Sequence, residues 1–213
     1  MLAAAAQASV IVLTLEGLQN LEPIGQYYNG GFGGSGSGPG PNYGIEFGSS
    51  ALAIIDGDAG GSGNIANEPS PSTVAFFLSG PGVVMNVPGG FTTGFSFFYT
   101  STSFAGTVTV WDDLDGAGNL LASLNLPALG SSCGGDPNGA FNCWSAVGVA
   151  FSGVAKSVNF GGTANQVAFD NITLGSKDPG GEIPEPGSMG LLASGLVAVW
   201  LRRRAVRRSS SSN

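Results

Sequence analysis

Short runs of alternating apolar and polar residues, separated by turn-forming residues, fill this chain from residue 9 to residue 175. Such alternation places one side of a strand in a core and the other in solvent. Glycine, with 37 of the 213 residues, disfavours long helices because it costs a helix interior about 1 kcal/mol per residue. The segments predicted as strands are 9–16, 42–47, 51–56, 73–79, 82–87, 92–99, 106–112, 120–126, 147–151, 155–160 and 166–174. This pattern predicts an all-β domain, an antiparallel β-sandwich that is jelly-roll-like.

The charge of the chain is low and unevenly distributed. Charged residues make up 10% of the sequence, against roughly 25% in a typical soluble domain. All 14 acidic residues lie in residues 1–186, where Lys156 and Lys177 are the only basic residues. An acidic body repels phosphate backbones, so nucleic acid is not expected as a partner. The chain has no histidine, which excludes Ser-His-Asp and Cys-His catalysis and His-ligated zinc sites.

The C-terminal part of the chain differs sharply from the body. Residues 187–201 are uncharged and mostly apolar, and as a helix they span about 22 Å against roughly 30 Å of hydrocarbon, which predicts one short transmembrane helix. An amphipathic surface helix is the weaker alternative, because the leucines and valines spread around the helix. By the positive-inside rule the arginines of residues 202–213 face the cytoplasm and the body faces outward. These arginines are Arg202, Arg203, Arg204, Arg207 and Arg208.

The order of Pro-Glu-Pro, short apolar helix and terminal arginine cluster resembles the PEP-CTERM sorting signal of Gram-negative bacteria. In that family a membrane-embedded protease, the exosortase, recognises the Pro-Glu-Pro motif and removes the helix. The resemblance implies that Pro184, Glu185 and Pro186 form the sorting motif and that exosortase and the membrane are partners. Prolines also keep a segment extended, as a protease cleft requires. The expected location is the cell surface or the extracellular matrix of a biofilm.

The N-terminal residues 1–8, MLAAAAQA, look like the remnant of a signal peptide, since Ala6-Gln7-Ala8 matches a small-x-small cleavage site. The alternative is an alanine-rich start of a strand. The predicted organisation is therefore a remnant at 1–8, an ectodomain at 9–175, a linker with the PEP motif at 176–186, then the helix and the cytoplasmic tail. Within the ectodomain, the glycine-rich segment 29–42 is predicted to be a flexible loop.

The two cysteines, Cys133 and Cys143, flank a segment rich in turn-forming residues. In an exported protein this spacing indicates a disulfide-closed loop, which stabilises the fold by roughly 2–3 kcal/mol. The alternatives are two reduced thiols or a two-thiol metal site, for which the sequence offers no other soft ligand.

The body also resembles a group of PEP-CTERM ectodomains, through LEGL, PNYGIEF, GFSFFYTS, VTVWD and the closing stretch that ends in FDNITLG. FDNITLG is a common last strand in carbohydrate-binding-like β-sandwiches, and in many such modules a calcium ion bridges the first and last strands. The resemblance implies a structural calcium site at Glu16 and Asp170, with Asn171 completing the shell. The alternative is that Asp170 and Asn171 cap turns. No other cofactor is predicted.

Three further groups of residues could carry chemistry. The acids of WDDLDGAGN have a spacing that faintly resembles a calcium loop but lack its downstream Glu, so a solvated hairpin turn is the better interpretation. A glycosidase needs two carboxylates, and the available acids are Glu16, Glu46, Glu68, Asp56 and Asp58. Sugar-stacking candidates are Tyr27, Tyr28, Tyr43, Tyr99, Trp111 and Trp144.

The sequence thus predicts a non-enzymatic, structural or adhesive surface protein. A carbohydrate-binding module that takes extracellular polysaccharide is the alternative, and a glycan-active hydrolase is the third hypothesis. An exposed row of aromatic residues on one sheet face would favour the second, and a cleft with two acids about 5–9 Å apart the third.

Overall fold

A computed structural model describes residues 10–136 and 139–180 of this protein. Several predicted segments lie outside these described residues: the signal-peptide remnant at 1–8, Pro184, Glu185 and Pro186 of the linker, the helix at 187–201, and the arginine-rich tail at 202–213. Within the described residues, no helix is long and apolar enough to cross a membrane.

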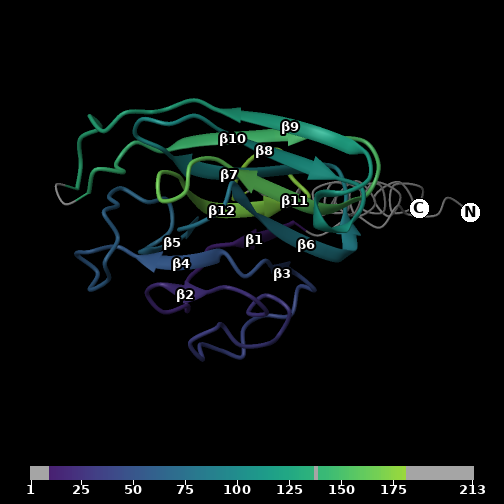
Figure 1. Cartoon of the computed structure of the whole chain (residues 1–213), viewed down its shortest axis with the longest axis horizontal. Helices are drawn as coiled ribbons and strands as arrows, with labels where there is room; N and C mark the ends of the chain where they lie inside the picture. The colour runs from purple at the N-terminus through teal and green to yellow at the C-terminus, as the bar shows by residue number, and fades with distance from the viewer. Residues whose placement is uncertain (1–9, 137–138, 181–213) are drawn as a thin grey trace, which may run out of the picture. The chain divides into compact units, whose positions relative to one another are not determined.

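Twelve strands form two sheets, and every strand pairing in the described part of the chain is antiparallel. The seven-stranded sheet has the order β10 (Ser145–Ala150), β7 (Gly94–Thr100), β12 (Ala168–Leu174), β5 (Thr73–Phe77), β4 (Ala51–Ile55) and β2 (Glu22–Pro23), with β1 (Ile11–Leu13) paired to β12. The five-stranded sheet has the order β3 (Glu46–Phe47), β6 (Gly82–Phe91), β11 (Ala155–Gly161), β8 (Gly106–Trp111) and β9 (Leu120–Leu126). A single 3₁₀ turn, η1 (Leu114–Gly116), lies in the hairpin between β8 and β9. In Figure 1 the two sheets overlap, with β9 and β10 along the upper edge and β2 and β3 along the lower edge.

The two sheets pack against each other through a core of buried phenylalanines. Phe97 on β7 and Phe169 on β12 belong to one sheet, and Phe160 on β11 belongs to the other. The ring centroid of Phe160 lies 5.9 Å from that of Phe97 and 4.9 Å from that of Phe169. Each aromatic ring removes a large apolar area from water, so this contact between the sheets dominates the core. The predicted all-β architecture with two antiparallel sheets is confirmed.

Eleven of the strands in the described residues overlap with predicted ones, although several bounds differ, and β2 is the strand that the sequence pattern did not indicate. It has only two residues, Glu22 and Pro23, which pair with Ala53 and Leu52 of β4. Two residues bounded by turns carry no period-2 alternation, so this element leaves no sequence signal.

Two long connections meet on the seven-stranded sheet at the left of Figure 1: residues 56–72 between β4 and β5, and residues 127–144 between β9 and β10. They dock through a parallel bridge between Ile65 and Phe141. Ile65 also packs with Phe76 and the half-buried Trp144 in a small apolar cluster separate from the main core. These two connections therefore form one folded cover at this end of the sheet.

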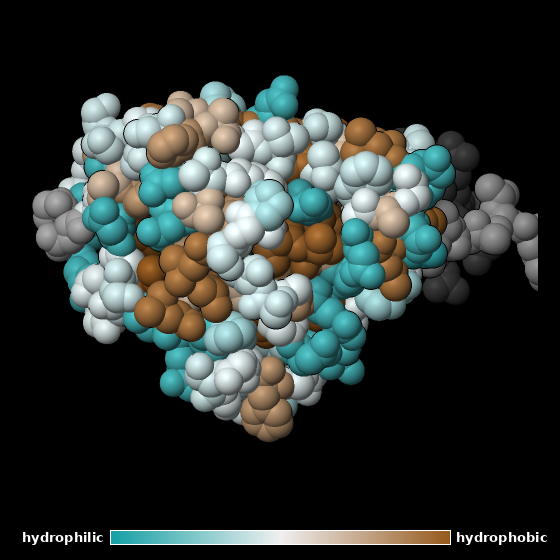
Figure 2. Space-filling model, in the orientation of Figure 1, coloured by the Kyte–Doolittle hydropathy of each residue, from teal (hydrophilic) through white to brown (hydrophobic). Residues whose placement is uncertain are grey.

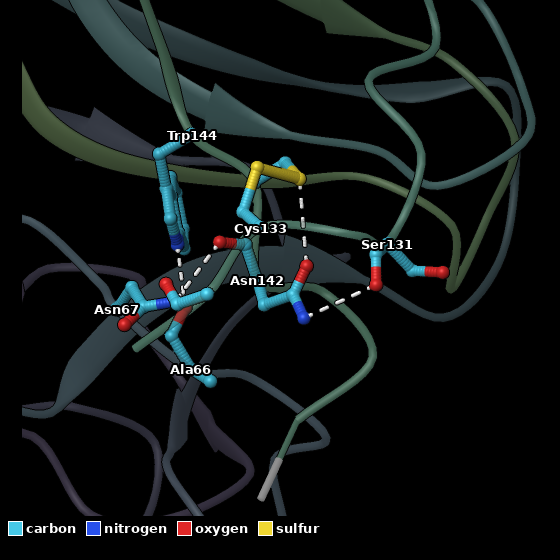
Figure 3. Close-up of a disulfide and its surroundings, with 8 residues drawn as sticks. Ala66, Asn67, Ser131, Cys133, Asn142 and Trp144 are labelled. Atoms are coloured by element: carbon cyan, nitrogen blue, oxygen red, sulfur yellow. Dashed lines mark hydrogen bonds between the residues drawn. A yellow bond between two sulfur atoms is a disulfide. The ribbon is translucent and has the colours of Figure 1, made fainter. Parts of the chain in front are cut away.

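The predicted disulfide between Cys133 and Cys143 is present, with the two Cα atoms 5.3 Å apart. Figure 3 shows how its loop is fastened to the 56–72 connection. Trp144 Nε1 donates to the carbonyl of Ala66 at 3.0 Å, and Asn67 Nδ2 donates to the carbonyl of Asn142 at 3.1 Å. The disulfide thus closes a loop that is itself hydrogen-bonded to the neighbouring connection.

Candidate functional site

A pocket of about 470 Å³ opens where the two connections meet the sheet. Its apolar lining comes from Ile54, Ile65, Phe76, Ala140, Phe141, Val167 and Ala168, and its polar lining from Ser62, Asn64, Thr102, Asn165 and Gln166. None of the described residues that line it has an acidic or basic side chain. Amides and hydroxyls beside apolar groups can exchange hydrogen bonds with a neutral polar ligand, but they supply neither an acid nor a base for catalysis.

Glu16 and Asp170, predicted to share a calcium ion, come from neighbouring strands as expected. β1 pairs with β12, with Leu13 opposite Ile172. Glu16 follows β1, and its Oε1 accepts hydrogen bonds from the backbone amides of Ser72 and Thr73, at 3.0 and 2.8 Å. The Glu16 carboxylate therefore already fastens the start of β5 to the first strand.

Asp170 is fully buried and is equally engaged. Its Oδ2 accepts from the backbone amide of Ser70 at 2.6 Å, and its Oδ1 accepts from Ser70 Oγ at 2.7 Å and from the amide of Asn171 at 2.6 Å. Burial raises the pKa of Asp170 to about 6, against the lowering effect of these hydrogen bonds, and the negative charge of Glu16 raises it further. The two carboxylates thus act on one segment, residues 70–73, and calcium between them stays a prediction.

The backbone conformation at Asn171 explains why an asparagine is found at this position. Its φ angle of 47° lies in the left-handed region, which asparagine tolerates better than most residues. The register of β12 against β7 shifts between Asp170 and Thr173, around this residue. Asn171 therefore marks a bulge in the last strand.

The other carboxylates considered for glycosidase chemistry are dispersed, except for one group. Glu46 lies on β3, where its Oε1 accepts a hydrogen bond from Asn29 at 3.0 Å. Carboxylate oxygens of Asp56, Asp58 and Asp136 lie within 4.8 Å of one another. Burial, and then the neighbouring Asp58, raise the pKa of Asp56 to about 6. Burial also raises the pKa of Glu68, with further contributions from Asp136, Asp58 and Asp170.

The acids of the β8–β9 hairpin serve the hairpin itself. Asp112 accepts hydrogen bonds from the backbone and side chain of Asn119 at 2.6 and 2.8 Å. Asp113 caps η1 through the amide of Leu114 and lies 3.8 Å from Lys156 Nζ. Asp115 Oδ1 accepts from Asn86 at 2.6 Å. The geometry agrees with a structured turn on the surface.

The aromatic candidates form no row on a sheet face in the described part of the chain. Tyr27, Tyr28 and Tyr99 are buried, and Trp111 and Trp144 are half-buried. Among the described residues, the exposed aromatic side chains are Phe32, Tyr43 and Phe104, and none of these three lies in a strand. Figure 2 shows apolar side chains in separate patches among polar ones on the face that it displays. The described sheet faces therefore have no flat row of aromatic rings on which a sugar chain could stack.

Glu22 is a structurally important acid that the sequence analysis missed. It is fully buried, and its carboxylate accepts hydrogen bonds from the amides of Gln19, Ser35 and Ser37 at 2.6, 2.8 and 3.0 Å and from the Ser37 hydroxyl at 2.5 Å. The glycine-rich segment 29–42, predicted to be a flexible loop, is a loop in which Ser35 and Ser37 are hydrogen-bonded to Glu22. The only signal in the sequence was a single acid, Glu22, a few residues before a glycine-rich segment that has many backbone amides and no acid of its own.

Comparison with known proteins decides what the C-terminal segment is. The family model of the PEP-CTERM protein-sorting motif matches residues 182–208. The chain is a PEP-CTERM sorting domain-containing protein. The motif implies that this PEP-CTERM protein is exported and sorted by an exosortase. It covers the predicted Pro-Glu-Pro, apolar and arginine segments.

No curated protein matches the chain of this PEP-CTERM protein. One similar solved structure is a glycoside hydrolase family 43 arabinoxylan arabinofuranohydrolase from Bacillus subtilis in complex with cellotetraose, with 18% identity and a TM-score of 0.38 over 59% of this chain and 24% of the hydrolase. Another is the carbohydrate-binding module CBM6cm-2 from Cellvibrio mixtus lichenase 5A in complex with cellotriose, with 13% identity and a TM-score of 0.36 over 59% of this chain and 86% of the module. The PEP-CTERM chain thus spans about a quarter of the hydrolase that it matches.

Proposed function

We propose that this PEP-CTERM protein is a non-enzymatic protein of the cell surface or extracellular matrix, whose β-sandwich acts as a structural or adhesive unit. The observation that carries the proposal is the sorting motif at residues 182–208, behind an acidic, disulfide-containing β domain. In this account the apolar segment 187–201 anchors the chain in the membrane until an exosortase acts at Pro184, Glu185 and Pro186.

The absence of enzymatic activity is supported by the arrangement of the acids. The described residues that line the pocket are all neutral. Glu16 and Asp170 each accept three hydrogen bonds from the protein, so neither is poised for proton transfer to a ligand. Asp56 is 1% exposed and offers a substrate almost no access.

The sorting part of the proposal is tested by transplantation. Residues 177–213 are fused to an exported reporter in a host that has an exosortase, and processing is followed by the size of the reporter. We expect a processed reporter in wild-type cells and a full-length one when Pro184, Glu185 and Pro186 are all replaced by alanine. Full-length reporter in wild-type cells, as in an exosortase-deficient strain, would contradict the proposal.

Binding of a neutral polysaccharide in the pocket is the second candidate function. The observation that favours it is the lining of three amides and two hydroxyls beside Phe76 and Phe141. A glycan array with the full chain, in mild detergent, tests it. We expect a neutral glycan to bind and Gln166→Ala to weaken that binding, whereas Phe104→Ala, outside the pocket, leaves it unchanged. An array without binders, or equal loss in both variants, would remove this candidate.

A further inference from the structure

Three carboxylates from two distant parts of the chain converge at the end of β4. Asp56 directly follows β4, and Asp58 lies two residues later. Asp136 comes from the disulfide-closed loop between Cys133 and Cys143. Oxygen atoms of all three lie within 4.8 Å of one another, a separation at which carboxylates repel each other strongly unless a proton or a cation lies between them.

The Asp56 carboxylate points to a missing ligand independently of this clustering. The residue is 1% exposed, and its Oδ1 is buried without a hydrogen-bond partner. Buried polar atoms are almost always paired, and an unpaired buried carboxylate oxygen is especially costly. Among the described residues the basic side chains are those of Lys156 and Lys177. These form ion pairs elsewhere, with Asp113 and Asp178.

We propose that Asp56, Asp58 and Asp136 bind a calcium ion that joins the β4–β5 connection to the disulfide loop. Hard carboxylate oxygens favour calcium or magnesium over softer metals. Magnesium requires near-ideal octahedral geometry and is reluctant to lose its waters, whereas calcium accepts irregular sets of six to eight oxygens. Glu68 is half-buried, and its charge helps to raise the pKa of Asp56, so it adds negative charge beside the ion.

The Asp56–Asp58 side of this site is already folded. Asp56 O accepts a hydrogen bond from Gly61 at 2.8 Å, and the amide of Gly63 donates to Ile55 O at 2.8 Å. A Cβ atom at Gly61 would lie 2.0 Å from Ile55 O, so only glycine allows the chain to curl back on β4 so closely. The curl fixes the backbone from which both aspartates project.

The Asp136 side is held by its own set of contacts. The amide of Asp136 donates to Asn67 Oδ1 at 2.9 Å, and the amide of Ala140 donates to Asn64 Oδ1 at 2.9 Å. The disulfide closes the loop behind these contacts. Preorganised ligands reduce the ordering cost of binding an ion, so both halves favour a site that forms without large rearrangement.

This site is separate from the calcium site predicted at Glu16 and Asp170. The hydrogen-bonding capacity of those two carboxylates is used by residues 70–73 and Asn171, whereas Asp56 Oδ1 has no donor. An experiment can therefore assign a bound ion to one site or the other.

The test uses the full chain in mild detergent, stripped with EDTA and titrated with CaCl₂ by calorimetry, together with thermal melts. We expect one strong site and a rise of the melting temperature by roughly 5–10 °C when calcium is at a hundred times Kd. Asp58→Asn, at an exposed position, and Asp136→Asn should each weaken binding at least tenfold. Both should leave the calcium-free melting temperature unchanged or higher, because they relieve repulsion.

Two controls make the result specific. Asp178→Asn removes an exposed acid outside the cluster and should keep the full calcium response, and so should Glu16→Gln. Lack of any heat or melting shift up to 10 mM calcium would overturn the proposal. So would a response that survives Asp58→Asn but is lost in Glu16→Gln. An equal response to magnesium would overturn the assignment to calcium.

Discussion

Two buried carboxylates near the β2 edge of the seven-stranded sheet differ in how their negative charge is stabilised. Glu22 on β2 and Asp56 at the end of β4 are 0% and 1% exposed. Burial alone would raise the pKa of Glu22, but hydrogen bonds from Ser37, Gln19 and Ser35 hold it below 4.5. Burial and the adjacent Asp58 raise the pKa of Asp56 to about 6. The charge of Glu22 is thus stabilised by hydrogen bonds from the protein, whereas that of Asp56 lies beside other negative charges.

The difference teaches what each acid does for the fold. Glu22 provides acceptors for the amides of a glycine-rich segment that has almost no side chains to pack, and so it holds residues 29–42 in place. Asp56 takes no comparable donor set and gathers two other aspartates around it. In this account the hydrogen bonds of the folded chain are sufficient to stabilise the charge of Glu22, whereas the charge of Asp56 is stabilised by a bound calcium ion.

The largest expected effect is that of Glu22→Gln. The amide would keep one acceptor oxygen but turn its NH₂ group toward backbone donors, so buried amides lose charge-assisted partners. We expect a loss of about 3 kcal/mol in the free energy of unfolding, measured by urea denaturation of the full chain in detergent. Glu46→Gln, at a half-buried acid on β3, is the control and should cost less than about 1 kcal/mol. Equal losses in the two variants would contradict the role given to Glu22.

Removing the disulfide should have the next largest effect on stability. It should affect the loop that carries Asp136 but not the segment 29–42 that is bonded to Glu22. The Cys133→Ser, Cys143→Ser double variant should lose roughly 2–3 kcal/mol of stability and most of its calcium affinity, because Asp136 is no longer held. Limited proteolysis should show new cleavage in 131–143 and none in 29–42. Unchanged calcium affinity in this variant would show that the loop does not position the ligand.

Asp56→Asn should change stability in the direction opposite to Glu22→Gln. Without calcium, the variant loses a buried charge and gains a donor toward Asp58, so we expect a stabilisation of about 1–2 kcal/mol. With calcium, wild type should become the more stable of the two. Urea denaturation in EDTA and in CaCl₂ measures both values. Destabilisation in EDTA, as for Glu22→Gln, would remove the contrast between the two acids.

A smaller effect is expected in the pH dependence of the stability that Glu22 contributes. Because its folded pKa is lowered, the ionised form stabilises the native state above pH 4.5, and this contribution is lost as the pH falls through the folded value. The stability difference between wild type and Glu22→Gln should therefore be constant near pH 7 and shrink as the pH falls below 4.5 toward the lowered folded pKa. Because the other acids titrate in both proteins, their contributions cancel when the stability of Glu22→Gln is subtracted from that of wild type. A difference that grows on acidification would contradict the lowered pKa.

The strands could be predicted from the sequence because alternation over five or more residues needs no tertiary information. Phe95 and Phe97 alternate along β7, and both are in the core. The disulfide was predictable because the chain has two cysteines. Pairing of the first strand, β1, with the last strand, β12, was expected from the jelly-roll-like fold and is seen in the structure.

The remaining features depend on contacts between distant residues. Asp56 and Asp58 lie two residues apart in a visible Asp-Gly-Asp pattern, but nothing local connects them with Asp136, which follows Cys133 in the disulfide loop. Similarly, Glu22 reaches Ser35 and Ser37 across a segment whose composition alone indicates flexibility. The acceptors of backbone amides in a glycine-rich segment are set by tertiary structure, and sequence periodicity carries no information about them.

Amide hydrogen exchange of the full chain, in EDTA and in CaCl₂, tests most directly whether one acid is satisfied internally and the other by a cation. We predict that calcium slows exchange in residues 56–63 and in 131–136, and that exchange in residues 29–42 stays the same. The ion would also steady Asn64 and Phe141 at the pocket, so slower exchange should extend to their neighbours. Protection confined to residues 70–73 and 170–171 would place the ion between Glu16 and Asp170 and contradict the account, as would exchange that calcium leaves unchanged throughout.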